Sequence, residues 1–94
     1  MSSYVYILTN KWNTILYIGS TTDLVQRVYS HKEKFLPGFT NKYNITKLVY
    51  YEIHESRVNA YHRERQMKKW RREWKIRLIE ENNPEWNDLY TEII

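Results

Sequence analysis

Two short segments rich in β-branched and aromatic residues open the chain and predict a β-hairpin. Residues 4–9 (YVYILT) and 14–19 (TILYIG) have the composition of strands. The residues between them, 10–13, begin and end with Asn, which is typical of a turn. This turn length pairs Thr9 with Thr14, and it places Tyr6 directly opposite Tyr17 on one face of the sheet.

A helix is predicted over residues 24–34, directly after the second strand. Thr22 is expected to cap it, with Asp23 in its first turn. Successive residues of a helix are rotated by about 100°, and on this projection one face carries two apolar and two polar residues. These residues are Leu24, Arg27, Val28 and His31.

A third strand and a long helix follow. After a loop over residues 37–44, the segment 47–53 (KLVYYEI) has strand composition, and Ser56 is expected to cap a helix that continues to about Glu81. One stripe of this helix spans about 80° and is expected to face the core, with Trp74 buried in it. The stripe holds Ala60, Glu64, Met67, Arg71, Trp74 and Leu78.

The pattern ends with residues 85–90, a possible short helix that packs Trp86 and Leu89. The order β-β-α-β-α-(α) predicts a small sheet covered by helices, in the α/β (α+β) class. Ninety-four residues fit a single domain, 1–94, which is expected to be structured over about 4–90.

The amino-acid composition excludes several classes of function. The chain has no cysteine, which excludes disulfides and thiolate chemistry, and no apolar run near the roughly 20 residues that span a bilayer. A cytoplasmic protein without membrane contact is therefore expected.

Residues 62–77 hold 8 basic and 2 acidic side chains, whereas residues 78–94 hold 5 acidic and no basic ones. A concentrated positive segment indicates a polyanionic partner.

Several polar residues are expected to point toward the same apolar interior. Each has a structural explanation when it is taken alone: the tyrosine pair stabilises the hairpin, Arg27 and His31 line a helix edge, and Glu64 pairs with Arg71 or a neighbouring lysine. Together they suit phosphodiester cleavage, because a carboxylate holds Mg²⁺, an arginine binds phosphate, and a phenol or imidazole accepts a proton. The set is Tyr6, Tyr17, Arg27, His31 and Glu64.

The order of these residues along the chain resembles the motif order of a known protein family. A degenerate triplet, Tyr4-Val5-Tyr6, precedes an intact Tyr17-Ile18-Gly19, and Arg27, His31 and Glu64 follow. With the strings GFTNKYN (38–44), LVYYE (48–52) and NNPEWNDLY (82–90), the chain resembles the GIY-YIG nuclease superfamily over essentially its whole length. It looks closest to the small single-domain bacterial UPF0213 type, which is related to the catalytic domain of the excision-repair nuclease subunit UvrC.

The resemblance implies a central three-stranded antiparallel sheet and hydrolysis of DNA through one divalent ion, Mg²⁺ or Mn²⁺. In this family pattern Tyr6 and Tyr17 orient or deprotonate the attacking water, Arg27 stabilises the charged transition state, and Glu64 binds the metal. His31 assists by holding a tyrosine or sharing proton transfer. Gly19 and an asparagine support the site; Asn83 is the first choice for the asparagine, with Asn82 and Asn87 as alternatives.

Two departures from the family affect the expected partners. The glycine of the first triplet is Tyr4 here, and these 94 residues include no separate DNA-recognition domain. DNA contacts are therefore expected from phosphate-binding side chains on the basic segment: Arg65, Lys68, Arg72 and Lys75. The DNA is expected to be branched, damaged or single-stranded, and a protein partner is a possible source of recognition.

Two other functions remain open at this point. One is a non-catalytic nucleic-acid-binding module, and the other is an accessory subunit of a repair complex. Which tyrosine acts as the base, and the oligomeric state, are also left open.

Overall fold

An antiparallel sheet with the strand order β2-β1-β3 lies at the centre of the computed structural model, which describes residues 2–35 and 37–94. The strands are β1 (Ser3–Thr9), β2 (Leu16–Thr21) and β3 (Lys47–His54). The helices are α1 (Leu24–Lys32), α2 (Phe39–Lys42), α3 (Arg57–Lys68), α4 (Arg72–Asn82) and α5 (Tyr90–Ile93). The predicted fold class and sheet are confirmed.

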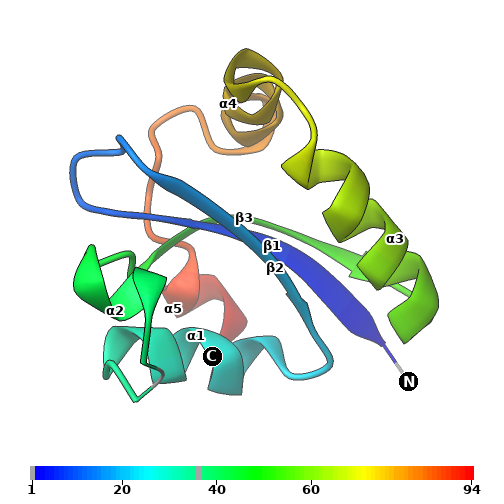
Figure 1. Cartoon of the computed structure of the whole chain (residues 1–94), viewed down its shortest axis with the longest axis horizontal. Helices are drawn as coiled ribbons and strands as arrows, with labels where there is room; N and C mark the ends of the chain where they lie inside the picture. The colour runs from blue at the N-terminus through cyan, green and yellow to red at the C-terminus, as the bar shows by residue number, and fades with distance from the viewer. Residues whose placement is uncertain (1, 36) are drawn as a thin grey trace.

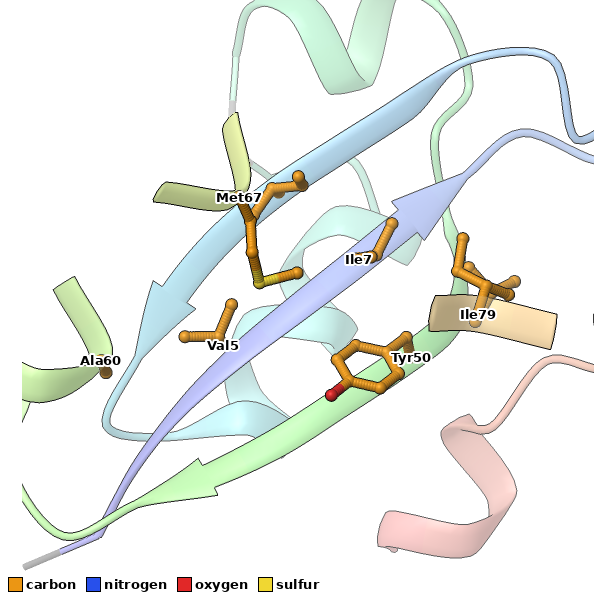
Figure 2. Close-up of a cluster of buried hydrophobic side chains, with 8 residues drawn as sticks. Val5, Ile7, Tyr50, Ala60, Met67 and Ile79 are labelled. Atoms are coloured by element: carbon orange, nitrogen blue, oxygen red, sulfur yellow. The ribbon is translucent and has the colours of Figure 1, made fainter. Parts of the chain in front are cut away.

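Helices cover both faces of this sheet (Figure 1). Helices α3 and α4 lie over one face, and α1, α2 and α5 lie over the other. β1 is the central strand, so its side chains alternate between two buried clusters. Val5 and Ile7 pack with residues such as Met67 and Ile79 under α3 and α4 (Figure 2). Tyr6 and Leu8 pack on the other face, with Leu24, Val28, Ile45 and Leu48.

The hairpin has a different register from the predicted one. Tyr6 pairs with Gly19, and Thr9 pairs with Leu16, so Tyr17 lies opposite Leu8. The cause is a longer connection: the Asn10 side chain accepts hydrogen bonds from the backbone N–H groups of Thr14 (2.9 Å) and Ile15 (3.3 Å) and holds both residues outside the ladder. Because the shift is by an even number of residues, Tyr6 and Tyr17 still share one face of the sheet.

The single long helix predicted over residues 56–81 is wrong. Ser56 caps α3 as expected, but α3 ends at Lys68, and α4 begins at Arg72 after an extended Arg71. A straight helix of that length would measure about 39 Å, whereas the longest dimension of the molecule is 31 Å. The break lets α4 turn back over the sheet, where Ile79 is buried.

The predicted core stripe is therefore correct only in part. Ala60 and Met67 on α3 are buried. Past the break, Arg71 is exposed and Trp74 is 46% exposed, whereas Leu78 of the predicted stripe packs against the core, as does Trp70 outside it.

Smaller differences concern the ends of helices. Asp23, and not Thr22, caps α1, because its carboxylate accepts a hydrogen bond from Gln26 N–H at 3.1 Å. The predicted loop 37–44 contains α2. The predicted C-terminal helix starts later than expected, at Tyr90, since the left-handed backbone of Trp86 (φ 56°) interrupts the segment before it. Across residues 2–35 and 37–94, no helix has the length and hydrophobicity needed to cross a bilayer.

Candidate active site

The tyrosine of the first triplet packs directly onto the glycine of the second. A Cβ atom on Gly19 would lie 2.4 Å from the Tyr6 hydroxyl oxygen and 2.6 Å from its Cζ, so only glycine leaves room for this ring. Tyr6 thus lies over β2, one of the two edge strands of the sheet. The Tyr17 ring lies beside it, with 6.5 Å between ring centroids.

Helix α1 brings a cation and an imidazole to the two phenols. Its buried residues Leu24 and Val28 seat it against the sheet, which orients Arg27 and His31 inward. Arg27 Nη1 donates to the Tyr6 hydroxyl at 3.5 Å. The His31 ring lies 6.3 Å from the Tyr6 ring and 5.7 Å from the Tyr17 ring, measured between centroids.

The two buried groups of this cluster have shifted pKa values. Burial raises the pKa of Tyr6 to about 12; Arg27 opposes that shift, and Tyr17 and Glu64 add to it. Burial, with a further contribution from the Arg27 charge, lowers the pKa of His31 below its ordinary value. At neutral pH Tyr6 is therefore a phenol and His31 a neutral imidazole.

Glu64 reaches the site from the opposite face of the sheet, which corrects the expectation that it shares one interior with the tyrosines. It lies on α3, whereas the phenols face α1. Its Oε1 accepts a hydrogen bond from Ser20 Oγ at 2.5 Å, and its side chain is only 13% exposed. Ser20 directly follows Gly19, so the two faces meet at β2. The Glu64 charge is also close enough to act on the pKa of Tyr6.

Ser20 was not among the residues singled out from the sequence. The alternation of a strand provides the signal: if residue 19 faces the phenols, residue 20 faces the opposite helix. Thr40 on α2 was also missed; its hydroxyl lies 2.9 Å from His31 Nδ1. No sequence pattern linked it to His31, because α2 falls in a segment predicted to be a loop.

A groove of about 380 Å³ opens beside the cluster. Two arginines and several hydroxyl groups line it, a composition that suits a phosphate-bearing ligand. Its lining includes Ser20, Thr21, Thr22, Arg27, Arg57 and Tyr61.

The carboxylate of Glu64 fits a metal ion that needs few protein ligands. Among residues 2–35 and 37–94, no group of three His, Cys, Asp or Glu side chains could hold a metal by itself. Mg²⁺ commonly uses one or two carboxylates and fills its other positions with water and substrate oxygens. The second oxygen of Glu64, Oε2, pairs with Lys68 Nζ at 2.6 Å. Since Lys68 is 52% exposed, its ammonium can leave when another cation arrives.

The expected DNA-contacting residues do not form one row, because they are split between two helices. Arg65 is exposed on α3 and donates to the Tyr61 hydroxyl at 3.0 Å, while Lys68 pairs with Glu64. On α4, Arg72 donates to the Asn13 carbonyl oxygen at 3.4 Å. Burial and the neighbouring Arg72 charge lower the pKa of Lys75.

Asn83 contacts a different part of the fold from the cluster. It is 4% exposed, and its Nδ2 donates to the carbonyl oxygens of Val49 (3.1 Å) and Asn87 (2.9 Å). Its Oδ1 accepts from Asn87 N–H at 3.0 Å. These bonds tie the C-terminal segment to β3, on the side of the sheet away from β2. The Asn82 side chain donates a hydrogen bond to Leu78 O, in its own helix.

Comparisons with known proteins show the family to which this chain is similar. The sequence profile of the GIY-YIG catalytic domain matches residues 2–77. A UPF0213 protein of Staphylococcus haemolyticus is 36% identical over 78 residues, which cover 83% of this chain and 94% of that protein. A UPF0213 protein of Clostridium perfringens is 38% identical and covers 82% of each chain. The solution NMR structure of a UPF0213 protein from Bacillus halodurans has a TM-score of 0.58 and 27% identity, and covers 94% of this chain and 93% of its own.

Proposed function

Since this chain belongs to the GIY-YIG family, as a small UPF0213-type protein, we propose that it is a divalent-metal-dependent endonuclease that hydrolyses DNA phosphodiester bonds. The family is a nuclease family, with DNA as its general substrate. One observation carries the proposal for this chain. The Tyr6 phenol and Arg27 lie on one face of the sheet, and the Glu64 carboxylate comes from the other face. These groups meet at Gly19 and Ser20 of β2.

Glu64, whose Oε1 is oriented by Ser20, would hold the metal. When bound there, Mg²⁺ or Mn²⁺ would supply positive charge for phosphodiester hydrolysis by water. Arg27, beside the groove, binds the non-bridging phosphate oxygens in a fork and remains charged throughout the reaction. Lys68, released from Glu64, becomes free to contact a neighbouring phosphate.

The two tyrosines have different roles in this proposal. Tyr6 is fully buried with its pKa raised to about 12, so it keeps its proton and fixes the Arg27 guanidinium. Tyr17 is only partly buried and shares the same face. It is therefore the phenol that contacts the attacking water and helps to remove its proton.

The DNA is held through its backbone. Arg65 and Arg72 are exposed on α3 and α4, and phosphate contacts of this kind position DNA without reading its bases. Binding is expected to be weak and sensitive to salt. We propose branched, damaged or single-stranded DNA as the substrate and repair or recombination as the setting.

Cleavage of a panel of single-stranded, duplex, flapped and four-way-junction DNAs tests the proposal. Wild type and Glu64→Ala run side by side with Mg²⁺, with Mn²⁺ or with EDTA. Metal-dependent products from wild type alone would support the nuclease and identify its preferred DNA structure. Equal cleavage by the variant would reject Glu64 as the metal ligand. DNA binding without cleavage by either protein would favour the non-catalytic binding module.

A further inference from the structure

The imidazole of His31 is held from one side by a single buried hydroxyl group. Thr40 Oγ1 lies 2.9 Å from His31 Nδ1, and both residues are buried. The two come from different helices, α1 and α2. The other ring nitrogen, Nε2, is buried and has no hydrogen-bond partner among residues 2–35 and 37–94.

Counting donors and acceptors distinguishes the two ways of forming this bond. If Nδ1–H donated to Thr40, the hydroxyl proton would be left without an acceptor in the described part of the chain, and Nε2 would be a bare acceptor. If the hydroxyl donates instead, its proton and the Nδ1 lone pair are both satisfied, and Nε2–H is the one polar group of the pair left without a partner in the described residues. The second arrangement leaves one unpaired group where the first leaves two, and because buried polar groups are nearly always hydrogen-bonded, it is favoured.

We infer that Thr40 is a positioning residue: its hydroxyl donates to Nδ1 and holds His31 as the neutral Nε2–H tautomer. Protonation of the ring is disfavoured by the buried surroundings and by Arg27, the charged group facing it from α1; the other titratable neighbours are the phenols Tyr6 and Tyr17.

The tautomer decides what His31 can do. With Nδ1 occupied and Nε2 protonated, the neutral ring has no free lone pair with which to take a proton from water. It offers one N–H donor next to the two phenol rings. His31 can therefore act only as a hydrogen-bond donor, to an oxygen that comes within reach of Nε2, and proton removal is left to a tyrosine. This consequence rests on the proposed nuclease function, whereas the tautomer rests on the hydrogen-bond geometry alone.

Nitrogen-15 NMR of the histidine rings tests the tautomer directly. The spectrum is recorded at about pH 8, well above the ordinary histidine pKa of about 6.5. His31→Gln identifies the His31 signals among the three histidines of the chain. The expected result is an unprotonated Nδ1 and a protonated Nε2. A protonated Nδ1 would overturn the inference, and wild-type protein is sufficient to show it.

Two variants of Thr40 test its control of the ring. Thr40→Val keeps the side-chain shape without the hydroxyl and is expected to raise the Nδ1–H population several-fold, while Thr40→Ser retains the wild-type pattern. An Nδ1 signal that does not change in Thr40→Val would contradict the inference.

Cleavage kinetics provide a separate readout. Thr40→Val is expected to lower kcat by roughly ten-fold or more with little change in KM, by analogy with the loss of outer hydrogen bonds at other sites, and Thr40→Ser should restore most of the rate. A wild-type rate in a Thr40→Val protein with an altered tautomer would reject the role of the tautomer in cleavage. If wild type cleaves no DNA, the proposed function fails, and the NMR result still decides the role of Thr40.

Discussion

The ring of Tyr6 occupies the space that a side chain at position 19 would fill. Tyr6 and Gly19 are paired across β1 and β2, and the phenol lies directly over the glycine. This contact places the Tyr6 hydroxyl within reach of Arg27 on one face of the sheet. On the other face Ser20, which follows Gly19 in β2, holds Glu64. The glycine therefore serves the site by leaving room for the phenol.

Gly19→Ala is expected to destabilise the protein and to displace the phenol. An added Cβ would clash with rigid ring atoms, and overpacking of this kind typically costs about 1–3 kcal/mol. Urea denaturation measures the loss. If the cost comes from the ring, Gly19→Ala should be much less harmful in a Tyr6→Ala background. Equal costs in the two backgrounds would show that the clash is not the cause.

Lys68 is expected to compete with the metal for Glu64. Its ammonium pairs with Oε2 of the carboxylate, so Lys68→Gln should strengthen Mg²⁺ or Mn²⁺ binding. A partly exposed ion pair contributes at most about 1 kcal/mol, which corresponds to about five-fold in affinity. Calorimetric titration of the free protein measures it. Lys69→Gln is the matched control, since Lys69 carries the same charge and makes no ion pair in the described residues. Equal affinities for the two variants would contradict the competition.

The two tryptophans on either side of the start of α4 are expected to differ in their contribution to stability. The sequence pattern predicted a buried Trp74, but Trp74 is nearly half exposed, whereas Trp70 packs against the core and its ring lies 5.0 Å from the Arg63 guanidinium. Trp70→Ala should cost about 2–3 kcal/mol, and Trp74→Ala under about 1 kcal/mol. Chemical denaturation measures the loss of unfolding free energy in both variants. A larger loss for Trp74→Ala would contradict the assignment of Trp70 to the core.

The stability of the fold is expected to fall as the pH drops below about 6.5, because of His31. Its pKa is lowered in the folded protein, so the unfolded chain takes up this proton first, and acid favours unfolding. The stability that comes from neutral His31 is complete above pH 6.5. Denaturation at a series of pH values in wild type and His31→Gln measures the difference, which should shrink as the pH falls from about 7.5 to 5. A constant difference would be evidence against the lowered pKa.

The sequence predicted the strands and the fold class because β-branched and aromatic residues are concentrated in β1, β2 and β3. It could not predict the register of the hairpin, which depends on how the Asn10 side chain closes the connection. Nor could it predict the break after α3: residues 69–71 (KWR) include neither Gly nor Pro, and the apolar spacing continues through them. The break lets α3 and α4 fit over a small sheet, and the size of the sheet is a property of the tertiary structure.

The sequence singled out residues of the candidate site but not their arrangement. Periodicity correctly placed Glu64 on the same side of α3 as Ala60 and Met67. It contains no information about which face of the sheet α3 covers, so the meeting of Glu64 with Tyr6 around the edge strand was not foreseen. Ser20 was missed for a related reason, since it bonds to a residue 44 positions away, and Thr40 was missed because α2 was predicted to be a loop.

We propose that Glu64 holds the catalytic metal of a nuclease site shared by both faces of the sheet. Glu64→Gln tests it most directly, because the amide keeps the shape and an oxygen for Ser20 while removing the charge. The measurement is the single-turnover cleavage rate with Mg²⁺, on the DNA structure that wild type prefers. The expected result is a loss of at least about a hundred-fold with unchanged thermal stability. Cleavage by Glu64→Gln at the wild-type rate would contradict it.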